Sequence, residues 1–196
     1  GGGIVANVGG DVSLGGTQSI NITASGGTLT YSQNDLSIST QGDDSPGTVL
    51  QSIGGGGGLV GAVEGSVDVG SASALGTDVS GSAISAESDA PISTSGVSSP
   101  GFTIQSIGGG GGLVGSAPTS VTVGSSGFGD SSSGAIKFTN TGGITTNGLN
   151  SSGVILQSIG GGGVYTTSSG GAVIRLGGSV VGNNDSASIT FNNEAP

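Results

Sequence analysis

Aliphatic residues alternate with small polar residues along much of this chain. In LVGAVEGSVDVG, residues 59–70, valines punctuate a background of Gly, Ala, Ser and acidic residues, and two later stretches repeat the arrangement. The aliphatic positions are Val60, Val63, Val67, Val69, Val114, Val121, Val123, Val173, Ile174, Leu176, Val180 and Val181. Such alternation is typical of half-buried strands and predicts strands of about four to seven residues. Helix-forming residues are sparse, so we expect almost no helix.

Residues that favour turns separate the predicted strands. Gly, Asn and Asp recur between them, and residues 44–47 and 98–101 combine Pro with Gly. Pro presets the φ angle of a turn and Gly tolerates a positive φ, so both segments predict type II turns.

The chain repeats itself. QSIGGGGGLVG occupies residues 51–61 and returns unchanged at 105–115, while QSIGGGGV at 157–164 has one glycine fewer. The segments ISTQGDDSPGTVLQSI, ISTSGVSSPGFTIQSI and ITTNGLNSSGVILQSI, from Ile38, Ile92 and Ile144, form a second signature ahead of each glycine run. The period is about 52 to 55 residues, which predicts repeats at 1–55, 56–109, 110–162 and, in part, 163–196. Residues 1–5 read as the tail of another copy and 189–196 mirror 84–91, so we expect a piece of a longer chain.

Short strands at a fixed period predict the fold. We expect an all-β chain, residues 1–196, that forms one repetitive parallel β-solenoid with glycine-rich loops. Each repeat divides into two rungs of about 26 residues, giving seven or eight rungs and a rod of about 35 Å. With 46 glycines and only six aromatic residues (two Tyr, four Phe), the core is expected to consist of Val, Ile, Leu and Ala.

The glycine runs and the residues before them are the candidate site. A run of this kind is a flexible linker, a phosphate-binding loop or a place where backbones approach closely. The phosphate motifs require a following Lys or helix, neither of which this sequence offers. In the close-approach interpretation, the Gln and Ser side chains bind the glycine backbone. The candidate positions are Gln51, Ser52, Ile53, Gly54, Gly55, Gly56, Gly57, Gly58, Gln105, Ser106, Ile107, Gly108, Gly109, Gly110, Gly111, Gly112, Gln157, Ser158, Ile159, Gly160, Gly161, Gly162 and Gly163.

Composition and charge argue against several classes of function. Twelve carboxylates against two cations give a net charge of −10, which disfavours nucleic acid, and no apolar run is long enough for membrane insertion. The absence of Cys and His removes thiolate metal sites and the usual catalytic triads. GGDVSLGG, residues 9–16, resembles a calcium-binding β-roll repeat, but its aspartate does not recur at that spacing. We therefore expect no enzyme activity, cofactor or metal site.

The run SPGxxxQSIGGGGG, at residues 45–58 and 99–112, resembles the glycine-rich repeats in passenger regions of bacterial autotransporters. The resemblance covers nearly the whole chain. It implies a right-handed parallel β-solenoid, extracellular on the surface of a Gram-negative bacterium, that acts in adhesion, aggregation or scaffolding. The implied partners are copies of itself, further repeats, host cells or surface polysaccharide.

Two alternatives to a surface adhesin stay open. Thr40, Thr94, Thr145 and Thr146 occupy equivalent positions, as a solenoid that binds ice or crystalline polysaccharide would need. A self-assembling extracellular or phage fibre would instead pack its glycine runs between chains.

Overall fold

The structure is a computed structural model of the 196-residue chain. It describes residues 4–7, 19–25, 27–54, 57–62, 66–69, 79–109, 111–116, 120–123, 130–161, 163–166, 173–176 and 183–195. Within these ranges every regular element is a strand of two to seven residues, and none is a helix. The all-β class is therefore confirmed. Val63, Val180 and Val181 lie outside the described residues, and the other predicted aliphatic positions fall in strands.

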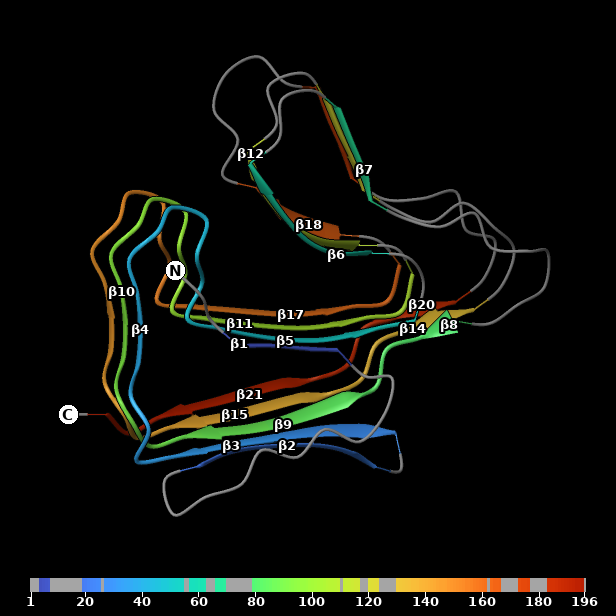
Figure 1. Cartoon of the computed structure of the whole chain (residues 1–196). Helices are drawn as coiled ribbons and strands as arrows, with labels where there is room; N and C mark the ends of the chain where they lie inside the picture. Colours follow the sequence, from blue (N-terminus) through green and yellow to red (C-terminus); the bar gives the residue numbers. More distant parts are fainter. Residues whose placement is uncertain are drawn as a thin grey trace.

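Strands from successive repeats lie side by side in six sheets (Figure 1). The QSI sheet has the order β1 (Ile4–Asn7), β5 (Thr48–Ile53), β11 (Phe102–Ile107) and β17 (Val154–Ile159). The IST sheet consists of β4 (Ile38–Thr40), β10 (Ile92–Thr94) and β16 (Ile144–Thr146). The hairpin sheet has the order β2 (Ser19–Ser25), β3 (Thr28–Asn34), β9 (Ala83–Ser88), β15 (Ile136–Asn140) and β21 (Ile189–Asn193).

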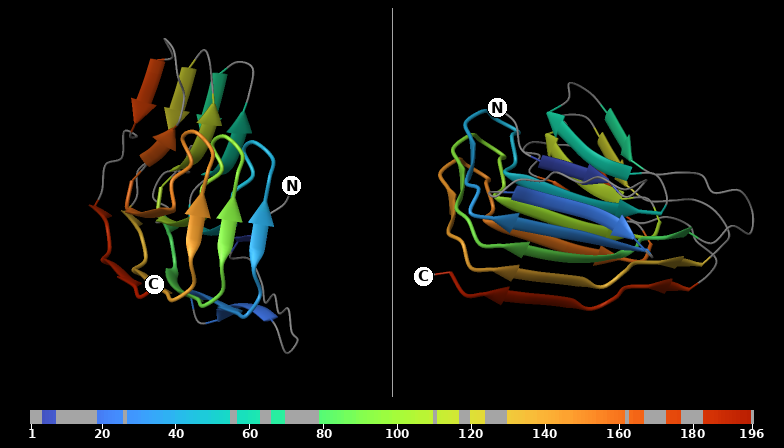
Figure 2. Two further views of the ribbon diagram at one scale, coloured as in Figure 1. Left: turned by 90° about the vertical axis from the view of Figure 1, so that its left-hand side faces the viewer. Right: turned by 60° about the horizontal axis from the view of Figure 1, so that its bottom comes forward.

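Three smaller sheets contain the remaining strands. One is formed by β6 (Gly57–Ala62), β12 (Gly111–Ser116) and β18 (Gly163–Thr166). Another is formed by β7 (Ser66–Val69), β13 (Ser120–Val123) and β19 (Val173–Leu176). The third is formed by β8 (Val79–Ser80), β14 (Ser131–Ser132) and β20 (Asn184–Asp185). Figure 2 shows the strands of each sheet following one another in sequence order across the molecule.

Pairing between repeats is parallel and in register. Gln51 lies beside Gln105, which lies beside Gln157, and residues paired between successive repeats are 52 to 55 residues apart, except between β1 and β5, where they are 44 apart. No described pair has the separation of about 26 that two rungs per repeat would require, so that prediction is wrong. Like residues face one another only when whole repeats stack, because the two halves of a repeat differ. The QSI sheet, with four strands, spans about 14 Å and not about 35 Å.

The first strand also corrects an expectation. Residues 1–5 were expected to match the end of a glycine run, which would set Ile4 beside Leu59. Instead β1 pairs with β5, so that Ile4 lies beside Thr48 and Asn7 beside Gln51. This register places Asn7 in line with Gln51, Gln105 and Gln157 along the sheet, which the glycine match would not do.

One pairing is antiparallel. Strands β2 and β3 form a hairpin in which Ser25 pairs with Thr28, and Gly27 in the turn has a φ of 76°. Strand β2 thereby covers the edge of β3 at the end of the hairpin sheet. The other described pairs are parallel.

The core is formed by residues of the QSI, IST and hairpin sheets, which face one another in Figure 1. Its buried members are Leu29, Tyr31, Ile38, Leu50, Ile84, Ala86, Ile92, Phe102, Ile104, Ile136 and Phe138. Aromatic rings contribute more than the composition predicted. Tyr31 meets Phe102 edge-on at 5.6 Å between ring centroids, and Phe102 lies 4.5 Å from Phe138. The expectation of an aliphatic core is therefore confirmed for most members of the cluster and wrong for Tyr31, Phe102 and Phe138.

The two inner strands of the QSI sheet, β5 and β11, are buried on both faces. Leu50 and Ile104 belong to the core cluster, while Val49 and Gln105, which alternate with them, are fully buried on the opposite face. Strands β5 and β11 consequently lack the alternating exposure that β3, β9 and β15 show. Burial of both faces is common in parallel sheets.

The predicted type II turns are not formed. Such a turn needs a positive φ at glycine, but among the described residues the left-handed positions are Asp35, Asp44, Ser98, Asn150 and Gly27. Gly47 is required for space, because a Cβ there would lie 2.5 Å from the Gly101 carbonyl oxygen. The glycine in these corners permits the next repeat to approach closely.

Candidate functional site

The three candidate glutamines form a ladder that runs across the QSI sheet. Gln51 Nε2 donates to Gln105 Oε1 at 2.6 Å, and Gln105 Nε2 donates to Gln157 Oε1 at 2.5 Å. Gln51 and Gln105 are buried, and Gln157 on the last strand is partly buried. Buried carboxamides need partners, and in this register each finds one in its own counterpart. The prediction that these side chains bind the glycine backbone is wrong for the glutamines.

The candidate serines project from the other face and bind a different stretch of backbone. Ser52 Oγ accepts from Ser82 N at 2.6 Å. Ser106 Oγ donates to the Ser82 carbonyl and accepts from Gly134 N, both at 2.8 Å. The Ser158 hydroxyl donates to the Gly134 carbonyl at 3.2 Å. These bonds join the QSI sheet to the segments that lead into the hairpin sheet.

The isoleucines complete the motif on the glutamine face. Ile107 is fully buried, while Ile53 and Ile159 in the neighbouring strands are partly buried. Their exposure differs although they lie in register, since Ile107 has a strand on either side.

The first glycine of each run lies where backbones approach closely. A Cβ on Gly54 would be 2.5 Å from Ser80 N, and one on Gly108 would be 2.3 Å from the Ser132 carbonyl oxygen. The same Cβ on Gly108 would be 2.6 Å from the Gly160 carbonyl oxygen in the next repeat. Real Cβ atoms do not approach backbone this closely, so no larger residue fits without a backbone shift.

The last glycines of the runs are strand residues, not loop residues as predicted. Gly57 pairs with Gly111 and Gly111 with Gly163, while Gly58 pairs with Gly112. Gly112 pairs in turn with Val164, so the third copy has valine in place of its fifth glycine and no residue of the run is deleted. Gly55, Gly56, Gly110 and Gly162 lie outside the described residues, and Gly109 and Gly161 lie in bends.

The structure also contains a second polar ladder that was not predicted from the sequence. Gln33, Ser88 and Asn140 are all buried in equivalent positions at the ends of β3, β9 and β15. Ser88 Oγ donates to Gln33 Oε1 at 2.9 Å, and Asn140 Nδ2 donates to Asn193 Oδ1 at 2.8 Å. The residue types change from repeat to repeat, so only the register reveals the column.

The equivalent threonines also belong to the interior. Thr40 and Thr94 are buried, and their hydroxyls donate to the carbonyls of Ser45 and Ser99 at 2.6 and 2.5 Å. Thr146 makes the matching bond at 2.9 Å and is partly exposed. The hypothesis of ice or polysaccharide binding required an exposed face of threonines. Thr40 and Thr94 are buried, so they cannot form part of such a face.

Carboxylates at the corners bind backbone in the adjacent repeat. Asp89 Oδ1 accepts from Asp35 N at 2.9 Å, and Asp43 Oδ1 accepts from Val97 N at 2.8 Å. These side chains satisfy backbone donors between layers. Among the described residues, no three acidic side chains gather where they could hold a metal ion.

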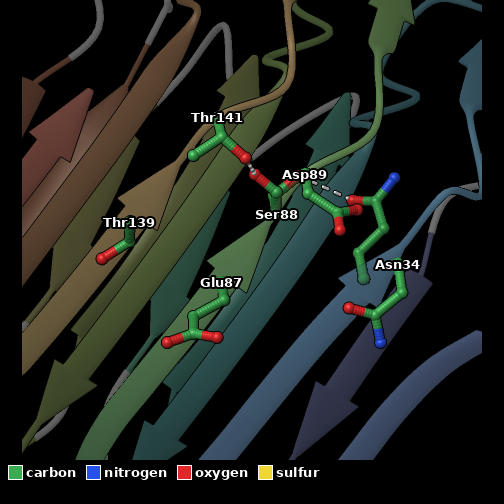
Figure 3. Close-up of a pocket in the computed structure, with 7 residues that line it drawn as sticks. Asn34, Glu87, Ser88, Asp89, Thr139 and Thr141 are labelled. Carbon is green, nitrogen blue, oxygen red and sulfur yellow. Dashed lines mark hydrogen bonds between the residues drawn. The ribbon is translucent and has the colours of Figure 1, made fainter. Parts of the chain in front are cut away.

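A cavity of about 200 Å³ with a polar lining lies at the ends of β3, β9 and β15 (Figure 3). Glu87 and Asp89 line it together with Gln33, Asn34, Ser88, Thr139 and Thr141. Thr141 Oγ1 donates to the Ser88 carbonyl at 3.5 Å, and Ser88 is bound to Gln33. The buried polar groups of this cavity are thus occupied with one another.

No family model, curated protein or solved structure matches this chain. Across the described residues no helix is long and apolar enough to cross a membrane.

Proposed function

We propose that this chain is a parallel β-solenoid that acts as a structural or adhesive protein outside the cell. Each repeat would form one layer, and stacked layers would form a stiff body with Ser, Thr and Gly on its surface. The observation that carries this proposal is the in-register pairing of whole repeats, with glutamine on glutamine through the centre of the QSI sheet. Such a stack suits a scaffold, since each layer contacts only its neighbours.

The surface and the motifs favour an extracellular, non-enzymatic role. The polar groups that sequence reasoning singled out are used inside the stack, where they hold one repeat against the next. The motif SPGxxxQSIGGGGG adds the resemblance to autotransporter passengers, which implies display on a bacterial surface. In the fibre alternative, glycine runs pack between chains, whereas Gly108 approaches Gly160 of the same chain.

The proposal is tested on cells that produce the protein. Fab fragments raised against the purified chain should label intact cells, and they should reduce cell aggregation or attachment to surfaces. Fab fragments from non-immune serum are the control. Labelling that appears only after the cells are lysed would contradict an extracellular role, and labelling without any effect on aggregation or attachment would contradict an adhesive one.

A further inference from the structure

The corner that follows each strand of the IST sheet has a glycine in the same place in every repeat. These glycines are Gly42, Gly96 and Gly148. A Cβ on Gly148 would overlap the Gly96 carbonyl oxygen, and a Cβ on Gly96 would overlap the Gly42 carbonyl oxygen. Successive repeats therefore touch at this glycine, and a larger residue does not fit without a backbone shift.

The residue before this glycine differs among the repeats and is exposed in each. Gln41, Ser95 and Asn147 follow in-register strands and occupy equivalent positions. Gln41 and Ser95 have a further repeat beyond them, so their exposure is a property of the corner. Because the corner requires glycine next, the asparagine of the third repeat stands in an Asn-Gly pair, and the chain contains no other such pair.

The backbone nitrogen of this glycine is not held by a hydrogen bond. Asn147 N donates to the Thr94 carbonyl, whereas Gly148 N donates to no described residue. The same is true of Gly42 N and Gly96 N, although each has a following repeat beside it. Gly148 is only partly buried, so water reaches the corner. An accessible amide nitrogen without an acceptor thus lies next to the carboxamide of Asn147.

This arrangement suits a ring closure between the two residues. Hydroxide removes the proton of Gly148 N, and the nitrogen attacks Cγ of Asn147 to form a new carbon–nitrogen bond. The bond from Cγ to Nδ2 then breaks, and the leaving nitrogen takes a proton from water and departs as ammonia. Water opens the resulting succinimide at either carbonyl, which leaves aspartate or isoaspartate at position 147. Glycine favours the attack because it has no Cβ to hinder the approach.

We propose that Asn147 is a site of spontaneous deamidation in the folded protein. Ser95 has no carboxamide, and Gln41 would have to close a larger ring, which forms more slowly, so the third repeat alone has this site at its corner. The inference goes beyond the proposed function and does not depend on where the protein acts.

The isoaspartate product changes the corner itself. It carries the main chain through the former side chain and so lengthens the backbone by one carbon, immediately before the glycine that lies against Gly96. The lengthened corner cannot keep both this contact and the bond from residue 147 to the Thr94 carbonyl. We therefore expect β16 to be held less firmly after the reaction.

The experiment follows the folded full chain over time in mildly alkaline buffer. Tandem mass spectrometry of its peptides locates the change from amide to acid, and an isoaspartate methyltransferase with a labelled methyl donor reports isoaspartate. Conversion should appear at Asn147. Asn147→Gln and Asn147→Ser, which restore the residues of the other two repeats, should abolish conversion and methyl labelling at this position. Asn150 is the internal control, because it is exposed in the same corner but is followed by Ser151, and it should convert more slowly.

A further variant separates the added charge from the longer backbone. Asn147→Asp carries the new carboxylate without the extra carbon. Hydrogen exchange in β16 should be faster in the aged parent than in the fresh parent, while Asn147→Asp should exchange like the fresh parent. Equal exchange in the aged and fresh parent would overturn the expected loosening of β16.

Two other results would overturn the proposed site. An Asn147 that stays intact in the folded chain, but converts when the chain is unfolded in urea, would show that the fold protects this corner. Conversion of Asn150 as fast as that of Asn147 would show that the glycine and its unbonded nitrogen do not select the site.

Discussion

At the scale of single residues, the recurring contact is between a side chain and its own counterpart in the next repeat. Gln105 lies between Gln51 and Gln157, and Phe138 stacks on Phe191. In-register strands are about 4.8 Å apart, so the counterpart is the nearest group a side chain meets. That proximity is why the glutamines bind one another and do not reach the glycine backbone.

The close approach at Gly108 predicts a large effect from one methyl group. Gly108→Ala should lower the free energy of unfolding by about 1–3 kcal/mol, because its Cβ would overlap two backbone carbonyls. Gly143→Ala is the control, since a Cβ there has nothing within 4 Å, and its effect should stay within about 0.5 kcal/mol. Urea unfolding measures both variants. Equal effects would show that Gly108 is not needed for space.

Tyr31 predicts a dependence of stability on alkaline pH. Burial raises the pKa of Tyr31 from 10.0 to about 12. Between these values the unfolded chain has lost this proton and the folded chain retains it, so the free energy of unfolding should fall as pH rises from about 10 to about 12. The loss attributable to Tyr31 should approach about 3 kcal/mol. Below pH 10 Tyr31 is protonated in both the folded and the unfolded chain, so it adds no pH dependence to the free energy of unfolding.

Two variants isolate this tyrosine. The chain has two tyrosines, so in Tyr165→Phe the tyrosinate absorbance reports Tyr31 alone and should appear well above pH 10. Tyr31→Phe should lose the extra destabilisation in urea unfolding. A midpoint near 10 in folded Tyr165→Phe would show that Tyr31 is not shielded from water.

At the scale of strands, the sequence predicts where strands occur and that they pair in parallel, but it does not predict which strands pair with one another. Alternating aliphatic residues correctly indicated strands such as β7 and β13, and the repeat length correctly predicted parallel pairing between copies. Alternation carries no information on the distance in sequence between paired strands, which is why two rungs were expected in place of one layer. The ladder from Gln33 to Asn140 was missed because its residue types differ among repeats.

The glutamine ladder predicts a non-additive response. Gln105→Leu leaves Gln51 Nε2 and Gln157 Oε1 without their partner, so it should cost about 1–3 kcal/mol in the free energy of unfolding. Replacing all three glutamines with leucine removes both orphans, and the triple variant should recover much of that loss. Urea unfolding of the single, the three pairwise and the triple variants tests this. Costs that simply add would contradict a coupled ladder.

At the scale of the whole molecule, the structure is a one-dimensional stack whose layers depend on their neighbours. Inner strands have a partner on each side, while β21 has β15 on one side only among the described strands. Hydrogen exchange should therefore be slowest in β11 and β10 and faster in β21. Mass spectrometry of peptides from these segments measures the difference. Uniform protection from β10 to β21 would contradict this gradient.

The match of one repeat to one layer bears on how such a protein changes length over evolution. The two copies of QSIGGGGGLVG are identical, and a recombination between the stretches of gene that encode them removes or adds 54 residues in frame. Because Gln51 and Gln105 occupy the same place in successive layers, the strands on either side of the junction still meet in register. Gain or loss of a repeat then changes the height of the molecule by a single strand spacing and leaves the register of the strands at the junction unchanged.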